Sequence, residues 1–268
     1  MKPGSAPPAG HKIPGQRLLL PLRNHRISYA AVVTLDASSC ACVMNVIVFA
    51  SRKGGSGKST LTAHLAAQAH RSLRSVLLID SDPQGSLTLW HNVRGSGEPP
   101  LRIASVATAD LITAARHTGY EWVFIDTPSS MSAAVTDAIH AAALVVIPAR
   151  VTLFDLVAIR ETMDLCRKLG KPYAVVINGA PARRDNTEAP YVREARQVLT
   201  QLNVPVWSGQ ITQRTHYSLA VTEGQGANEY ESTSEAAAEI AALWNAIEKS
   251  VKAIQGLYEG VAMHRVAA

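Results

Sequence analysis

Residues 46–60 read VIVFASRKGGSGKST, and this stretch decides the fold. The run VIVFAS (46–51) is apolar, rich in β-branched residues and uninterrupted, which is typical of a strand covered on both faces. A glycine-rich loop follows, and then Leu61, Leu65 and Ala69 recur at near-helical spacing within 58–71. Glycines let such a loop turn its N–H groups inward, and the next helix presents its positive N-terminus. The stretch therefore predicts a strand, a phosphate-binding loop and a helix.

The loop itself follows a variant pattern. The general phosphate-loop pattern GxxxxGK[ST] requires a glycine at position 52, where this chain has Arg52; the variant KGGxGK[ST] fits instead, with an additional lysine, Lys53. Lys58 is predicted to reach the β- and γ-phosphates, and the Ser59 hydroxyl is predicted to bind Mg²⁺. A chance glycine-rich turn is the alternative, and the placement between strand and helix argues against it. The predicted nucleotide-contacting residues in the loop are Gly54, Gly55, Ser56, Gly57, Lys58, Ser59 and Thr60.

Apolar runs alternate with helical stretches along the rest of the chain. Further strands are predicted at 76–80, 122–126, 144–148 and 173–178, with helices at 153–169 and 191–202 among those between them. This alternation predicts an α/β fold: a doubly wound, mostly parallel sheet with helices on both faces. Ligands of such sheets bind beyond the carboxyl ends of the strands.

Acidic residues stand at two of these strand ends. The strand at 76–80 leads into Asp80-Ser-Asp82-Pro-Gln, and the strand at 122–126 ends in Asp126. An acid at the end of an apolar strand matches the Walker B aspartate, which holds Mg²⁺ through water. For Asp80 and Asp82 the alternative is an ordinary turn and helix cap.

Together these motifs resemble the ParA/MinD family of P-loop ATPases with a deviant Walker A loop. The resemblance covers roughly residues 45–250. It implies a homodimer with two ATP molecules sandwiched between the subunits, in which Lys53 contacts the phosphates bound by the partner. It also implies ATP hydrolysis that is weak without a stimulating partner.

The resemblance also implies roles for single residues. Asp82 would position the attacking water, so the implied catalytic residues are Lys53, Lys58 and Asp82. Asp80 would support the magnesium and lysine network, so the implied metal-site residues are Ser59, Asp80 and Asp126. Asn178, at the end of the strand at 173–178, would recognise adenine, although an asparagine before a glycine is also an ordinary turn residue.

The segments 82–90 and 153–156 resemble the small ParA subtype, which lacks an N-terminal helix-turn-helix domain. This subtype implies a cytoplasmic, nucleoid-associated protein whose ATP-bound dimer binds DNA non-specifically. A ParB-like or cargo-linked protein would stimulate hydrolysis, and the cycle would partition DNA or position a cargo. Non-specific DNA binding requires only basic residues on one face, and each candidate has a solvated surface charge as its alternative. The candidate DNA contacts are Arg183, Arg184, Arg214, Lys249 and Lys252.

Two other hypotheses remain open. The first is a MinD-like, membrane-cycling ATPase; the second is a module that holds ATP without turning it over. The last predicted helix, at 234–257, carries an apolar stripe but mixes acidic and basic residues on its polar face. A membrane-surface helix has a strongly basic polar face, so we predict a helix docked on the core.

Composition sets the outer bounds. The 268 residues are 47% hydrophobic and 18% charged, which suits a packed core, and three cysteines exclude a disulfide scaffold and favour a reducing compartment. Cys166 alone in the body excludes the two-cysteine cluster of related iron proteins. Of the net charge of +5, residues 1–43 carry +4. That irregular stretch is interpreted as a disordered extension, a targeting arm or, our preference, translated upstream sequence before a natural start at Met44. Residues 44–268 are predicted to form one domain.

Overall fold

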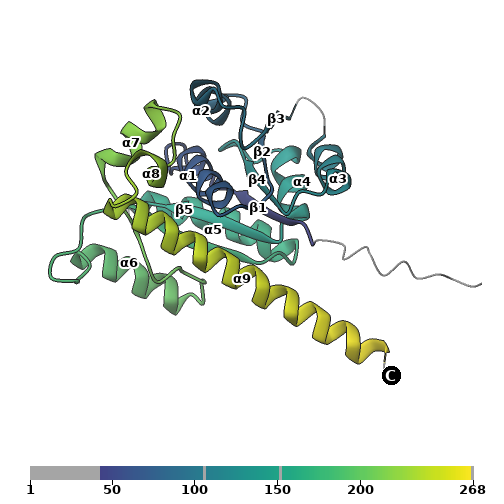
Figure 1. The fold of residues 1–268 in the computed structure, drawn as a ribbon. Helices are drawn as coiled ribbons and strands as arrows, with labels where there is room; N and C mark the ends of the chain where they lie inside the picture. Colours follow the sequence, from purple (N-terminus) through teal and green to yellow (C-terminus); the bar gives the residue numbers. More distant parts are fainter. Residues whose placement is uncertain (1–42, 105–106, 151–152, 267–268) are drawn as a thin grey trace, which may run out of the picture. The chain divides into compact units, whose positions relative to one another are not determined.

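The computed structural model describes residues 43–104, 107–150 and 153–266, with the side chains of 153–158 and 258–266 left aside. The predicted irregular stretch 1–43 therefore lies outside the described residues, apart from Val43. Strands and helices alternate along the chain (Figure 1). In order they are β1 (Asn45–Phe49), α1 (Lys58–Arg71), β2 (Val76–Asp80), α2 (Ser86–Arg94), β3 (Leu101–Ile103), α3 (Thr108–Thr118), β4 (Trp122–Asp126), α4 (Ala133–Ala141), β5 (Leu144–Ala149), α5 (Leu153–Lys168), β6 (Tyr173–Ala180), α6 (Pro190–Gln201), β7 (Ile211–Thr212), α7 (Thr215–Thr222), α8 (Ala227–Tyr230) and α9 (Glu235–Val266).

The strands form one seven-stranded sheet in the order β3-β2-β4-β1-β5-β6-β7, and every pairing is parallel. The predicted α/β fold with a parallel sheet is confirmed. The central strand β1 lies between β4 and β5, where the strand order reverses. Asp126 is the register partner of both Phe49 and Asp80. The phosphate loop and the two acidic strand ends therefore meet at the carboxyl edge of the sheet, where such folds bind ligands.

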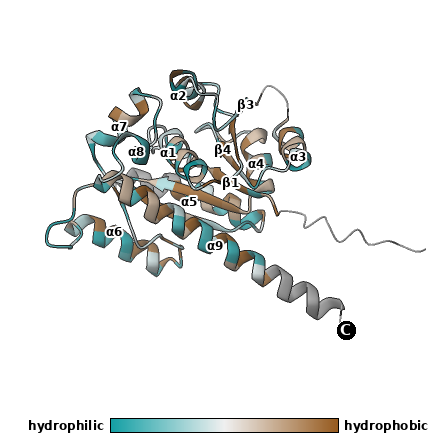
Figure 2. Cartoon of the chain, in the orientation of Figure 1, coloured by the Kyte–Doolittle hydropathy of each residue, from teal (hydrophilic) through white to brown (hydrophobic). Residues whose placement is uncertain are grey.

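Helices cover both faces of the sheet, as predicted. On one face Phe49 and Leu78 pack with residues of α1, α2, α7, α8 and α9. On the other face Val48 and Ile79 pack with residues of α3, α4, α5 and α6. Figure 2 shows the apolar strand β1 inside and hydrophilic residues along the outer helices. Because a strand places alternate side chains on opposite faces, the continuous apolar run of β1 supplies both cores.

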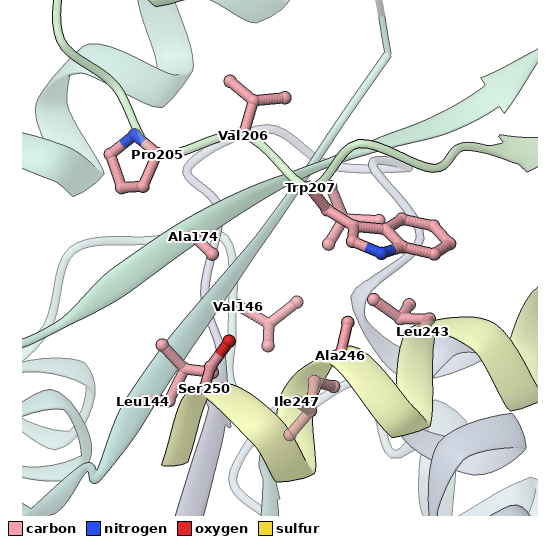
Figure 3. Close-up of a pocket in the computed structure, with 11 residues that line it drawn as sticks. Leu144, Val146, Ala174, Pro205, Val206, Trp207, Leu243, Ala246, Ile247 and Ser250 are labelled. Carbon is pink, nitrogen blue, oxygen red and sulfur yellow. The ribbon is translucent and has the colours of Figure 1, made fainter. Parts of the chain in front are cut away.

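Helix α9 crosses one face of the sheet, as Figure 1 shows. Five large apolar residues of its described part are buried, as predicted for a helix docked on the core: Ile240, Leu243, Trp244, Ile247 and Val251. Trp244 lies edge-on to Trp122 of β4, with 4.7 Å between ring centroids. Beside α9 an apolar cavity of about 190 Å³ lies between the helix, the sheet and Trp207 (Figure 3). In the part of the chain that the structure describes, no helix is long and apolar enough to cross a membrane.

The predicted elements agree with the structure to within two residues, except that α9 continues to Val266. The structure also contains elements that have no counterpart among the predictions made by range. These are the short strands β3 and β7 and the helices α2, α3, α4, α7 and α8. Most are too short to complete a periodic pattern, so tertiary packing decides them.

Candidate nucleotide-binding site

The phosphate loop owes its shape to two glycines with left-handed backbone. Gly55 has φ +72° and Gly57 has φ +101°. A Cβ on Gly57 would lie 2.1 Å from the side-chain nitrogen of Asn178, so glycine is required there on two counts. Helix α1 then begins at Lys58 with no acidic residue in its first turn and no side-chain cap on Gly57. Its first N–H groups are therefore suited to an anion.

Lys58 is the loop lysine whose side chain lies inside the protein. Its side chain is buried, and Nζ lies 3.4 Å from the carbonyl oxygen of Ser51. Burial lowers the pKa of Lys58, while the carboxylates of Asp126 and Asp82 act in the opposite direction. A cation that is short of solvation gains most from a charged ligand such as a phosphate.

Asp126 is the buried acid of the site. Its side chain is fully buried, and neither carboxylate oxygen has a hydrogen-bond partner among the described residues. Burial raises the pKa of Asp126 to about 7, with Asp80 and Asp82 adding to the effect and Ser59 and Lys58 opposing it. An unpaired buried carboxylate is costly. The arrangement therefore fits a site completed by a cation, and the neighbouring Ser59 supplies the hydroxyl expected of a Mg²⁺ site.

Asp80 organises the segment that carries Asp82. One oxygen of Asp80 accepts the Asp82 N–H at 3.1 Å, and the other accepts the N–H and hydroxyl of Thr88 at 2.8 and 2.6 Å. Asp82 in turn accepts the Gln84 N–H at 3.0 Å. The alternative interpretation, a turn and helix cap, thus holds for the hydrogen bonding of both acids. These hydrogen bonds leave lone pairs free on both carboxylates. The catalytic role of Asp82 and the metal role of Asp80 therefore stay predictions.

A cavity of about 290 Å³ adjoins the loop. Gly55, Gly57 and Thr60 line one side of it, and Asn178 and Gly179 at the end of β6 line another. The side-chain amide of Asn178 donates to the Ser56 carbonyl oxygen at 2.7 Å, which leaves its own oxygen as an acceptor for a ligand. The remaining walls come from Leu61, Arg150, Ile211, Thr212, Gln213, Arg214, Tyr217 and Ser218.

Lys53, Ser56 and Thr60 complete the loop. The Lys53 N–H lies 3.5 Å from the Ser51 hydroxyl oxygen, and its side chain is half-buried. The Ser56 hydroxyl is buried without a hydrogen-bond partner among the described residues. The structure thus brings the predicted loop residues, both acidic strand ends and Asn178 together at one edge of the sheet.

The candidate DNA contacts are not one patch. Arg183 and Arg184 follow β6 on the loop side of the sheet, where Arg183 lies 3.0 Å from Glu188. Lys249 and Lys252 are exposed on α9. That helix lies against the end of β7 at Glu239, and Lys249 is ten residues further on, about 15 Å along the axis. The basic residues therefore form two separate groups.

Arg214 differs from the other candidates because it is held by two carboxylates. Its Nη1 lies 2.5 Å from Glu235 Oε2 and its Nη2 lies 3.1 Å from Glu239 Oε1. Only 23% of the Arg214 side chain is exposed. An arginine already paired twice has little charge to offer a DNA phosphate, so its predicted contact with DNA would require this pairing to change.

Sequence patterns missed several site residues. Thr88 joins Asp80, and the Ser81 hydroxyl donates to the Asp126 carbonyl oxygen at 2.7 Å. Arg150 and Gln213 line the cavity beside Asn178. The threonine at the third position of a helix after an acidic turn was a usable signal for Thr88. The walls from β7 had none, because β7 has only two residues.

A glycine loop between the central strand and a helix, with a buried acid on the neighbouring strand, defines a P-loop nucleotide-binding protein. The chain belongs to the ParA/MinD family of P-loop ATPases: residues 47–227 match the family model described as "CobQ/CobB/MinD/ParA nucleotide binding domain".

Curated relatives are similar in sequence, and solved structures share the fold. The chain is 30% identical over 182 residues to the maintenance of carboxysome distribution protein A of Gloeobacter kilaueensis, covering 67% of this chain and 82% of that protein. It is 33% identical over 141 residues to the chromosome-partitioning ATPase Soj of Thermus thermophilus, covering 41% and 56%. An ATP complex of a Cyanothece McdA variant superposes with a TM-score of 0.61 at 17% identity over 78% of this chain and 96% of that one. The Mg-ADP complex of MinD from Pyrococcus horikoshii gives 0.59 at 19% identity, covering 77% and 97%.

Proposed function

We propose that this protein hydrolyses ATP to ADP and phosphate and uses the nucleotide cycle to position a cargo or partition DNA. The observation that carries the proposal is the shared edge of the sheet, where Lys58, Asp82 and Asp126 lie around the glycine loop. Relatives whose names state chromosome partitioning and carboxysome distribution support the positioning role. The matching family model is described as a nucleotide-binding domain, and one relative is named a chromosome-partitioning ATPase, which supports the reaction.

The residues of the site fit ATP with Mg²⁺. Backbone N–H groups from Gly54 to Ser59 would hold the phosphates, and Lys58 would pair with the β- and γ-phosphates. Ser59 and Asp126 would hold Mg²⁺, which supplies neutralisation of phosphate charge when bound. In the described residues no group of three or more His, Cys, Asp or Glu side chains could hold a metal ion. The nucleotide and water would therefore provide the other magnesium ligands.

The chain's own side chains would divide the work of hydrolysis. Asp82 would orient the attacking water in line with the γ-phosphate. Asp80 would set the position of Asp82 by accepting its N–H. Lys58 would offset the charge that develops on the phosphate oxygens. The side-chain oxygen of Asn178 would accept a hydrogen bond from the amino group of adenine, while the side-chain nitrogen still donates to the loop.

Lys53 is the residue that would make the cycle depend on two subunits. It precedes Lys58 by five residues. We propose that it contacts the phosphates bound by a second copy of the chain. An ATP-bound dimer would then be stable and an ADP-bound protein would separate. Slow hydrolysis by the isolated protein and acceleration by a ParB-like or cargo-linked partner complete the proposal.

Dimerisation would also double each basic group. We propose that Arg183 and Arg184, or Lys249 and Lys252, contact DNA phosphates when two subunits place them on one face. The charge of +1 in residues 44–268 supports a local patch rather than a generally basic surface.

One experiment tests the proposed function. Fluorescence anisotropy with a duplex of mixed sequence should show DNA binding with ATP and Mg²⁺, and little binding with ADP or without nucleotide. Reversing both arginines (Arg183→Glu with Arg184→Glu) or both lysines (Lys249→Glu with Lys252→Glu) identifies the patch, since each double variant changes the charge equally. Loss of binding should be larger at low salt than at high salt.

The alternative outcome is ATP-dependent binding to a membrane instead of DNA. Liposomes with anionic headgroups serve as the parallel arm of that experiment. Co-sedimentation with liposomes that requires ATP and exceeds DNA binding would replace the DNA proposal with a MinD-like membrane cycle. The buried apolar stripe of α9 argues against this outcome, because its side chains from Ile240 to Val251 are packed on the core and are not available to lipid.

A further inference from the structure

Glu239 on α9 holds three residues at once. Its Oε2 accepts the Thr212 N–H at 2.9 Å and the Tyr217 hydroxyl at 2.7 Å. Its Oε1 accepts two donors of Arg214, Nε at 3.3 Å and Nη2 at 3.1 Å. Only 18% of the Glu239 side chain is exposed. A partly buried carboxylate with four donors is a strong fixed point, because charge-assisted hydrogen bonds exceed neutral ones.

All three of these partners line the cavity beside the phosphate loop: Thr212, Arg214 and Tyr217. Glu239 itself is not a lining residue of that cavity. It lines a second cavity of about 420 Å³, which Thr212 and Arg214 also line. Residues of the segment 212–217, which we call the wall, thus line both cavities, and Glu239 holds this segment by hydrogen bonds without lining the first cavity.

The wall also touches the helix that follows the loop. Tyr217 lies against His64 of α1 with 5.2 Å between ring centroids. Burial, with the nearby Glu239 carboxylate, raises the pKa of Tyr217, so its hydroxyl stays protonated and remains a donor. At the other end of the wall the Gln213 N–H donates to the Ala180 carbonyl oxygen at 2.7 Å. The wall is therefore attached to α1, β6 and α9.

We propose that Glu239 is a positioning residue for nucleotide binding. It sets the wall that faces the base and ribose, without touching the nucleotide. This inference rests on the proposed function, since it takes the cavity beside the loop as the place of the nucleoside. The phosphates depend on the loop residues, whereas the base side depends on the wall.

Removal of the carboxylate has a definite physical consequence. The Thr212 N–H would lose its acceptor, and the Tyr217 hydroxyl would keep only the Ala236 carbonyl oxygen at 3.3 Å, both on buried residues. Arg214 would keep only Glu235, whose side chain is 75% exposed. A buried donor without a partner is costly, so the wall would shift to find others.

The same helix provides a matched control. Glu248 is also on α9, is 17% exposed and accepts a hydrogen bond from Arg74 at 2.9 Å. It lies outside the residues that line the nucleotide cavity. Glu239→Ala and Glu248→Ala therefore remove equally buried, arginine-paired carboxylates, of which only one holds the wall.

The experiment measures dissociation constants for ATP, ADP and inorganic tripolyphosphate, each with Mg²⁺, by calorimetry. Tripolyphosphate has no base or ribose, so it reports on the phosphate loop alone. For Glu239→Ala we expect weaker binding of ATP and ADP by about tenfold and of tripolyphosphate by less than about twofold. For Glu248→Ala all three affinities should change by less than about twofold.

Two results would overturn the inference. One is a folded Glu239→Ala protein with the ATP affinity of the wild type; the other is an equal loss for ATP and tripolyphosphate. If Glu239→Ala does not fold, the same measurements are made on Glu239→Gln, which keeps one acceptor oxygen. A selective loss for ATP in that variant supports the inference, and an unchanged ATP affinity overturns it. A wild-type protein that binds tripolyphosphate but not ATP would overturn the proposed function and this inference with it.

Discussion

The side-chain amide of Asn178 donates a hydrogen bond of 2.7 Å to the main-chain carbonyl oxygen of Ser56. This bond joins the end of β6 to the phosphate loop across 122 residues of sequence. It is made possible by Gly57, where a side chain would occupy the place of the amide. The loop is therefore shaped by a distant strand as well as by its own glycines, and the base side of the cavity is linked to the phosphate side.

Replacing Gly57 with alanine should damage both stability and nucleotide binding. The left-handed backbone at Gly57 costs an alanine about 1 kcal/mol, and the new methyl group would collide with Asn178. Gly119 is the matched control, because it has φ +88° but nothing within 4 Å of an added Cβ. Thermal unfolding should show a larger loss for Gly57→Ala than for Gly119→Ala, and calorimetry should show weakened ATP binding in the former alone. Equal behaviour of the two variants would refute the Asn178 contact.

Alanine substitutions of the two loop lysines should have different effects on nucleotide binding and dimerisation. Lys58→Ala should abolish ATP binding, because the β- and γ-phosphates lose their buried cation. Lys53→Ala should retain ATP binding by the monomer and lose the ATP-dependent dimer. Calorimetry and sedimentation velocity, run on both variants, separate these outcomes. ATP affinity retained by Lys58→Ala would sink the assignment of the site.

Substitution of Asp82 should reduce ATP turnover without weakening ATP binding. Asp82→Ala removes the carboxylate proposed to orient water, while Asp80 still accepts the N–H of residue 82. Phosphate release should fall to background, with ATP affinity within about threefold of the wild type. Measurable release at the wild-type rate would return Asp82 to the role of a turn residue, as its bond to the Gln84 N–H already allows.

Because His64 is buried, we expect the free energy of unfolding to depend on pH. Burial lowers the pKa of His64 to about 4 from 6.5, with the Tyr217 backbone and Glu229 acting in the opposite direction. Its Nδ1 accepts the Ala227 N–H at 3.0 Å. Well above pH 6.5 the ring is neutral in both the folded and the unfolded protein. As the pH falls below 6.5, the ring takes up a proton in the unfolded chain but stays neutral in the folded protein. This group should therefore cost about 3 kcal/mol of unfolding free energy as pH falls from 6.5 to 4.

His64→Asn provides the comparison, since its side-chain oxygen can accept the Ala227 N–H but does not titrate. Denaturant unfolding of both proteins at several pH values gives the difference. The loss of stability between pH 6.5 and 4 should be smaller in the variant. Parallel curves for the two proteins would contradict the buried, neutral state of His64.

Much of the fold follows from local sequence. The runs at 46–51, 76–80 and 122–126 are continuous and apolar because both of their faces are buried, and a parallel sheet is the arrangement that buries both. The glycine loop and the acids Asp80 and Asp126 stand directly at the ends of such runs. Their meeting at one edge of the sheet follows from the parallel direction of the strands, before any distance is known.

The wall of the nucleotide cavity does not follow from local sequence. Thr212 and Tyr217 belong to a two-residue strand and a short helix that have no periodic pattern. Their positions depend on Glu239, and the pairing of Arg214 with that carboxylate likewise appears only once α9 has docked. The amino-acid sequence by itself therefore determined the phosphate loop, whose chemistry lies in eight consecutive residues. Only the tertiary structure decided how the base side is walled and which carboxylates pair with Arg214, because those contacts join residues that burial of the core brings together.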